Sequence, residues 1–258
     1  MEFLLQVLPI YLLVLVRVTA FFVSAPIFSN RGVPNQFKIG FGIVVAAISF
    51  SYVTVVEPIQ LDLTFAMLAV KEALIGVMLG FLCQMFFFAI QIAGGLMDMQ
   101  LGLAMANVID PRTGAYVPIT GNFKSMLATL YFLSINGHHV LIDGLLRSYK
   151  MVPIDKVWVP INSEQMLWFI VRAFEYMFSS AFLMATPIVV SLFLVDLSLG
   201  IIAKSVPQFN IFVVGLPIKL IAGFLLLIVV MPAFFLVISG LFERMFRALV
   251  EMLRLLGG

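Results

Sequence analysis

Six long runs of apolar residues dominate this sequence and leave few folds open to it. Each run is free or nearly free of charge, and the runs are 3–30, 39–56, 73–97, 125–142, 176–195 and 220–242. A helix needs about 20 residues to cross the hydrocarbon core of a bilayer. Only 11% of the 258 residues are charged, against about 25% in soluble domains. Because lipid satisfies no backbone hydrogen bonds, the runs predict an all-α integral membrane protein with about six long hydrophobic helices.

Two of these runs depart from a simple span. The run 125–142 contains an asparagine and two adjacent histidines, so it either crosses the membrane or is broken. The segment 71–109, which contains the third run, is too long for one straight span. That helix must tilt, extend beyond the bilayer or break, and we expect a break at Gly94–Gly95.

Polar and small residues recur along the third run. Gln84, Gln91 and Asp98 are spaced seven apart, which is close to two helical turns, so they share one face. Such a face should contact protein or water rather than lipid. Two interpretations remain open: hydrogen bonding between helices, and the lining of an aqueous path. Gly76 and Gly80 form a small-xxx-small pair that lets another helix approach closely.

Charged residues within or beside the runs should find partners. Arg17 lies midway along the first run, Asp196 ends the fifth and Lys219 opens the sixth, while Arg172 and Glu175 precede the fifth. An unpaired charge is costly in lipid. We therefore expect these residues to pair with other charges, and we expect the segments to pack into a large protein assembly.

The connection after the third run has an unusual composition. Residues 108–122 read VIDPRTGAYVPITGN. An Asp-Pro step ends a helix, and the glycines and second proline should prevent helix through 110–121. By local rules alone this segment is a turn-rich loop.

The final segment, 241–258, has a different pattern from the apolar runs. Its charges fall at helical spacing beside leucine and phenylalanine. This pattern predicts an amphipathic tail that lies at the membrane surface or on a partner.

The sequence contains no motif for catalysis or for a cofactor. HExxH, Walker A, GxGxxG and GxSxG patterns do not occur. His138 and His139 are adjacent without a cysteine or acidic cluster, so a zinc site is not expected. We expect no enzyme, no metal, no cofactor and, at a net charge of +2, no nucleic-acid partner. A small secondary transporter or channel is the alternative class, although no inverted repeat is visible.

Several segments resemble the FliR family, which is called SctT in injectisomes. They are GGLMDMQLGLAMANVIDPRTG (94–114), NGHHVLIDGL (136–145) and KSVPQFNIFVVGLPIKL (204–220). The resemblance covers essentially the whole chain and includes APIFSNRGVPNQFKIG (25–40). It is closer to the flagellar members. These are core membrane components of the type III export gate that passes unfolded flagellar proteins across the bacterial inner membrane.

The resemblance also implies an architecture and a set of partners. Residues 1–165 would form a FliP-like region, and 166–258 a FliQ-like helical hairpin with a turn at 196–210 and the amphipathic tail. The expected partners are FliP-, FliQ-, FlhB- and FlhA-like subunits, together with unfolded export substrates. The chain would sit in the inner membrane at the flagellar basal body.

Three groups of residues are expected to carry this function. The loop 106–122 would plug the conduit through Val108, Ile109, Asp110, Pro111, Gly114, Tyr116, Val117, Pro118 and Ile119. A polar helix face would pack against partner subunits through Gln84, Gln91, Asp98 and Arg17. The hairpin and its partner contacts would involve Lys204, Pro207, Gln208, Asn210, Gly215, Pro217 and Lys219.

Overall fold

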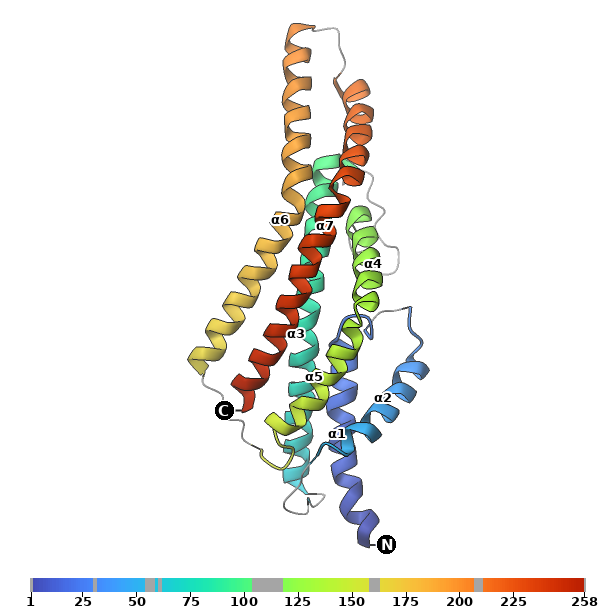
Figure 1. Cartoon of the computed structure of the whole chain (residues 1–258), viewed down its shortest axis with the longest axis vertical. Helices are drawn as coiled ribbons and strands as arrows, with labels where there is room; N and C mark the ends of the chain where they lie inside the picture. The colour runs from blue at the N-terminus through green and yellow to red at the C-terminus, as the bar shows by residue number, and fades with distance from the viewer. Residues whose placement is uncertain are drawn as a thin grey trace. The chain divides into compact units, whose positions relative to one another are not determined.

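The computed structural model of the chain describes residues 2–29, 32–53, 59, 62–103, 118–157, 163–206 and 211–257. The regular structure in these ranges is helical, and no strand occurs in them. The helices are α1 (Glu2–Ser24), α2 (Asn35–Phe50), α3 (Leu63–Leu101), α4 (Ile119–Ser134), α5 (Gly137–Met151), α6 (Ser163–Ser205) and α7 (Ile211–Gly257) (Figure 1). The predicted all-α class is confirmed.

Four of these helices are long and apolar enough to cross a membrane. The qualifying segments are Val7–Ser24, Leu63–Leu101, Glu164–Ser205 and Val213–Gly257. They contain three of the six predicted apolar runs and most of a fourth, 3–30. The run 39–56 falls largely in α2, an apolar helix of 16 residues. The chain is therefore an all-α integral membrane protein.

The run 125–142 is broken, which settles the alternative left open by its sequence. α4 ends at Ser134 and α5 begins at Gly137. Between them Asn136 adopts a left-handed conformation with φ of 57°, which asparagine tolerates better than most residues. A Cβ at position 137 would lie 2.5 Å from the ring of Phe132. The glycine therefore lets the aromatic ring close over the break.

The expected break of α3 at Gly94–Gly95 is wrong. α3 continues without interruption for 39 residues, a length of roughly 58 Å at 1.5 Å per residue. Its glycines instead serve close packing. A Cβ at position 76 would lie 2.4 Å from the Arg17 carbonyl oxygen, and one at position 80 would lie 2.1 Å from Ser24 Oγ. The small-xxx-small pair is thus the place where α1 packs against α3, as predicted.

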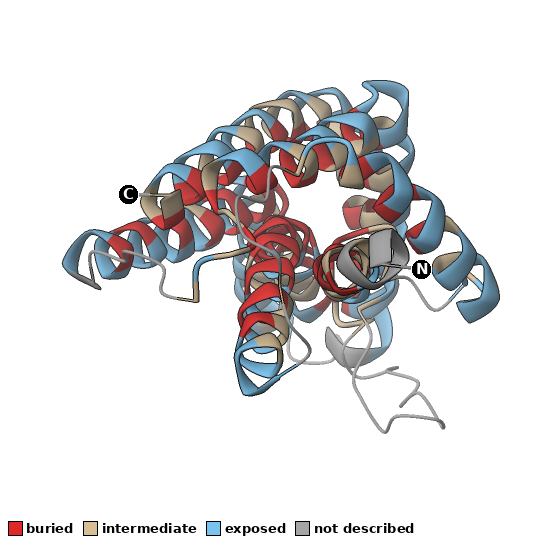
Figure 2. Cartoon of the chain, turned by 90° about the horizontal axis from the view of Figure 1, so that it is seen from below, coloured by how far each residue is buried: buried red, intermediate tan, exposed pale blue. Residues whose placement is uncertain are grey.

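The chain forms two compact units, each assembled from separate stretches of sequence. Unit 1 comprises 1–86, 132–174 and 243–258, and unit 2 comprises 87–131 and 175–242. Along α6 and α7 exposed residues outnumber buried ones and the buried ones recur at helical spacing, whereas α3 is buried over most of its middle (Figure 2). This division by packing differs from the predicted boundary at 165/166. That boundary rests on the resemblance and stays a prediction.

The predicted amphipathic tail is a continuation of α7. In residues 241–257 most apolar side chains are buried within the chain, whereas Val250 is 43% exposed. A position of the tail at the membrane surface or on a partner stays a prediction. Within unit 1 this part packs against α5, where a Cβ on Gly144 would lie 2.5 Å from Leu249 Cδ2. Gly257 likewise approaches the Met151 carbonyl oxygen. The amphipathic pattern exists because one face of the helix covers α5.

Candidate functional site

Most of the predicted plug lies outside the described residues, which omit 104–117. This applies to Val108, Ile109, Asp110, Pro111, Gly114, Tyr116 and Val117. Pro118 and Ile119 are described, and the Ile119 side chain is 52% exposed. α4 already begins at Ile119, so the expectation of no helix through 121 is wrong for its last three residues.

The start of α4 is held by a carboxylate from α3. Asp98 is completely buried, and its two carboxylate oxygens lie 3.2 and 3.3 Å from the backbone N–H of Thr120, which donates to them. The Thr120 hydroxyl contacts the same carboxylate and lies 2.9 Å from the Gly94 carbonyl oxygen. The first N–H groups of a helix need acceptors, and a negative charge is favourable there. Asp98 therefore caps α4 from another helix.

Two glycines bring the helices close enough for this cap. A Cβ at position 94 would lie 2.1 Å from the Gly121 Cα, and one at position 121 would lie 3.2 Å from the Gln91 carbonyl oxygen. We call Gly94, Asp98, Thr120 and Gly121 the clasp. It joins the end of α3 to the start of α4. The two ends of the segment between residues 98 and 120 are therefore held next to each other.

A buried cation lies one turn beyond the clasp in α4. The side chain of Lys124 is 1% exposed, and its ammonium lies 4.5 Å from the ring centroid of Phe234 on α7. Burial lowers the pKa of Lys124 to about 8 because the charged form loses hydration. In the described part of the chain, Lys124 forms no ion pair.

The three polar residues that share a face of α3 have different surroundings. Asp98 is buried in the clasp, whereas Gln91 is exposed. Gln84 is half-buried, and its Oε1 atom is buried without a hydrogen-bond partner among the described residues. Asp98 thus fits the interpretation of hydrogen bonding between helices, and the two glutamines remain candidates for contacts with a partner.

Arg17 is fully buried in unit 1 and has its partners there. Its guanidinium forms a bidentate ion pair with Glu72 of α3, with 2.9 Å between Nη2 and Oε1. It also donates to Ser148 Oγ and to the Val152 carbonyl oxygen, each at 2.9 Å. The ring of Tyr149 lies 4.3 Å from the guanidinium carbon. The predicted pairing of Arg17 is confirmed, and its charge is neutralised within the chain.

Lys71 extends this network to the segment after α5. Its ammonium lies 2.8 Å from Glu72 Oε1. It donates to the carbonyl oxygens of Pro153, Ile154 and Lys156, at 2.8, 3.0 and 2.9 Å. The network therefore ties α1, α3 and residues 148–156 together. Glu72 and Lys71 were not predicted, because they flank the apolar run 73–97 rather than interrupt it.

The predicted hairpin is present, with a shorter turn than 196–210. α6 continues to Ser205 and α7 starts at Ile211, and Pro207, Gln208 and Asn210 lie outside the described residues. Lys204 and Pro217 are exposed, and Gly215 is buried.

A polar cluster bridges α6 and α7 within unit 2. Lys219 lies 2.7 Å from Asp196 Oδ2, which also accepts a hydrogen bond from Gln100 of α3 at 2.9 Å. The predicted pairing of Asp196 and Lys219 is confirmed.

Residues 8–245 match the family described as bacterial export proteins, family 1. The chain belongs to this family. The FliR-type relatives include the flagellar biosynthetic protein FliR of Bacillus subtilis, which is 42% identical over 100% of this chain and 99% of its own. FliR of Escherichia coli is 34% identical over 95% of this chain and 93% of its own. The Yop proteins translocation protein T of Yersinia pestis is 30% identical over 85% of this chain and 84% of its own. The resemblance to the FliR and SctT family is confirmed.

The clasp is a further difference between the observed site of this export protein and the predicted one. The clasp was missed except for Asp98, because the sequence does not say which helix approaches Gly94. A signal was present in retrospect: Gly94 and Asp98 lie one helical turn apart on α3, and Thr120 and Gly121 begin the next helix. Small and capping residues in that spacing are what two closely packed helix ends require.

Proposed function

We propose that this protein is a core subunit of the flagellar type III export gate in the bacterial inner membrane, at the flagellar basal body. It would form a closed conduit with FliP-, FliQ- and FlhB-like subunits, and with a FlhA-like subunit nearby. Unfolded flagellar proteins would pass through that conduit. The observation that carries this proposal is the match of the chain, over its full length, to a flagellar FliR.

The exposed apolar surface of the hairpin supports assembly with partners. In an apolar stretch of 18 residues within each helix, only 22% of the residues of α6 and 17% of those of α7 are buried within the chain. These helices have 43 and 47 residues, so each is about twice as long as a bilayer core requires. Apolar side chains that extend beyond the lipid need protein neighbours.

The clasp supports a gating role for the loop that follows α3. A plug must keep one position until it is displaced, and its ends must therefore be fixed. The capped start of α4 and the glycine contact to α3 fix both ends. In this proposal the loop 106–122 closes the conduit. The export substrate or a partner displaces the part of the loop before Thr120, while the clasp stays in place.

Deletion of residues 108–116 tests the gating role and leaves the clasp residues unchanged. We expect the assembled gate to become leaky, because the occluding side chains are lost while the frame that carries them stays. The measurement is the permeation of ions or small molecules into cells or vesicles that contain the complex. A control that replaces 108–116 with nine glycine and serine residues should leak as well. Unchanged permeability of both variants, in correctly assembled complexes, would contradict the gating role.

A further inference from the structure

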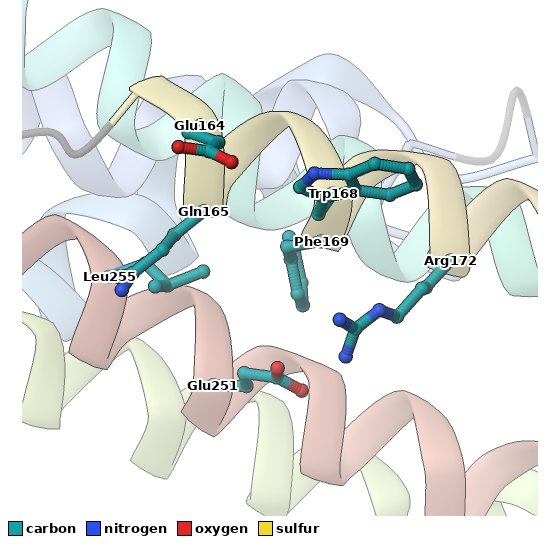
Figure 3. A pocket seen from close by; sticks show the side chains of 7 residues that line it. All are labelled: Glu164, Gln165, Trp168, Phe169, Arg172, Glu251 and Leu255. Atoms are coloured by element: carbon teal, nitrogen blue, oxygen red, sulfur yellow. The ribbon is translucent and has the colours of Figure 1, made fainter.

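A pocket of about 390 Å³ lies between the first turns of α6 and the last turns of α7, within unit 1 (Figure 3). The proposed export function assigns no role to it. Its lining combines two carboxylates, one guanidinium and one indole with apolar side chains. Such a mixture differs from the apolar surface of the rest of the hairpin.

Two opposite charges face each other across this pocket. The guanidinium of Arg172 points from α6 toward the carboxylate of Glu251 on α7 (Figure 3). No ion pair joins them, and neither side chain forms one elsewhere among the described residues. Two exposed charges that face each other without contact leave room for a ligand that bridges them.

The remaining lining residues supply an aromatic wall and an apolar floor. Trp168 is 55% exposed, whereas Phe169 beside it is 7% exposed and points between the two helices (Figure 3). Glu164 adds a second carboxylate at the start of α6. With Glu251 and Arg172 the lining therefore carries a net charge of −1, which disfavours a purely anionic ligand.

The charges and the position of the pocket select a class of ligand. A guanidinium binds a phosphate through two parallel hydrogen bonds. A primary ammonium has three N–H donors for carboxylates, and an indole attracts cations. Arg172 comes four residues, about one helical turn, before the charge-free run 176–195. That offset corresponds to the headgroup layer of a bilayer, where tryptophan is enriched.

We propose that this pocket binds the headgroup of phosphatidylethanolamine. The phosphate contacts Arg172, and the ammonium contacts Glu251 with Trp168 beside it. The acyl chains continue toward the run 176–195 along exposed apolar side chains of α6, among them Phe174 and Phe178. A headgroup without an amine, such as phosphatidylglycerol, offers nothing to the carboxylates and binds less well.

Native mass spectrometry of the full chain from nanodiscs tests this proposal. The nanodiscs contain equal amounts of phosphatidylethanolamine and phosphatidylglycerol, and the retained lipids are counted after gentle activation. We expect the wild-type chain to retain phosphatidylethanolamine preferentially. Arg172→Gln and Glu251→Gln should each weaken this preference by about tenfold, as expected for the loss of one charge-assisted hydrogen bond. Arg147→Gln is the matched control, because Arg147 is an exposed arginine paired with Asp143 on α5.

Fluorescence gives a second measurement that does not depend on the gas phase. The chain has two tryptophans, so Trp158→Phe leaves Trp168 as the reporter. Addition of phosphatidylethanolamine to phosphatidylglycerol nanodiscs should shift its emission, and Arg172→Gln should abolish the shift. A shift that soluble glycerophosphoethanolamine produces at the same concentration as the lipid would contradict a lipid ligand.

Two further results would overturn the proposal. The first is equal retention of the two lipids, or a preference that Arg172→Gln leaves unchanged. The second comes from a photo-crosslinking amino acid at position 168 in the assembled complex. Its capture of a partner subunit, with loss of the retained lipid, would show that a protein helix fills the pocket.

Discussion

Arg17 shows how a charge is kept inside a chain of this composition. Its partners come from α3, from α5 and from the segment after α5, and they include a carboxylate, a hydroxyl, a carbonyl oxygen and an aromatic face. Burying a charge is tolerable when such a set replaces its hydration. Lys124 is a different case, since its ammonium rests against an aromatic ring in a site where burial disfavours its charged form.

A double-mutant cycle on Arg17 and Glu72 measures the strength of the buried pair. Arg17→Met and Glu72→Met each leave one charge buried without its main partner, at a cost of about 3–5 kcal/mol. The double variant should lose less than the sum, with a coupling of about 1–3 kcal/mol. Thermal unfolding of the purified chain in detergent gives these values.

The pair Arg147 and Asp143 is the matched control for that cycle. Its side chains are 68% and 54% exposed, so water screens the attraction and the coupling should be far smaller. Equal coupling in the two cycles would contradict the account of the buried network.

Lys124 predicts a pH dependence of stability. Its pKa is about 8 in the folded chain, against 10.5 for an ordinary lysine. Between these values the unfolded chain binds more protons, so the stability contributed by Lys124 rises as the pH increases from 8 to 10.5. The full change is about 3 kcal/mol at 1.36 kcal/mol per pKa unit.

Comparison with Lys124→Met isolates this effect. The variant should be more stable than the wild type below pH 8, and the difference should shrink by pH 10.5. Lys204→Met is the control, because it removes the same charge from an exposed site. A difference in thermal stability that does not change with pH would contradict the burial of a charged Lys124.

At the scale of elements, the glycines of α3 position the neighbouring helices. α1 packs at Gly76 and Gly80, and α4 packs at Gly94, where the clasp also caps its first turn. The continuity of α3 matters for this, because an uninterrupted helix carries all of these contact points in a fixed register. The loop after α3 thus begins and ends on one rigid element.

Gly94→Ala should disrupt the clasp. The new methyl group would lie 2.1 Å from the backbone of Gly121, so the helices must separate, at a cost of about 1–3 kcal/mol. Gly240→Ala is the matched control, since nothing lies within 4 Å of a Cβ there and alanine is the better helix former. Unfolding temperatures should fall for the first variant and stay or rise for the second. The same change for both variants would contradict the close contact.

The sequence predicted the elements better than their contacts. The apolar runs follow from the chemistry of lipid, and the helix break at Asn136 follows from backbone chemistry. Both act locally in the sequence. The role of Gly94 and the partner of Arg17 depend on which helix lies opposite, and no local pattern contains that information. The contact between the tail and α5 was not predicted for the same reason: an amphipathic face suits a membrane, a partner or α5 equally well. The central part of the predicted plug lies outside the described residues, so it stays a prediction.

At the scale of the whole molecule, many large apolar side chains of the described residues are not covered by the chain itself. Large hydrophobic side chains are exposed along α2, α6 and α7, and the two long helices exceed the thickness of a bilayer core. A lone transporter would enclose its polar groups and present to lipid only a length that matches the membrane. An assembly subunit uses the excess surface for its neighbours, as a member of a bacterial export family would.

Secretion by a flagellated bacterium that lacks its own FliR tests the central claim most directly. The chain is expressed in that strain, and hook and filament proteins are measured in the culture medium. We predict that the wild-type chain restores their secretion, that Gly240→Ala does so equally well, and that Gly94→Ala does so poorly. The account would be contradicted if the chain assembled in the membrane with the FliP- and FliQ-like subunits while secretion stayed at the level of the deletion strain.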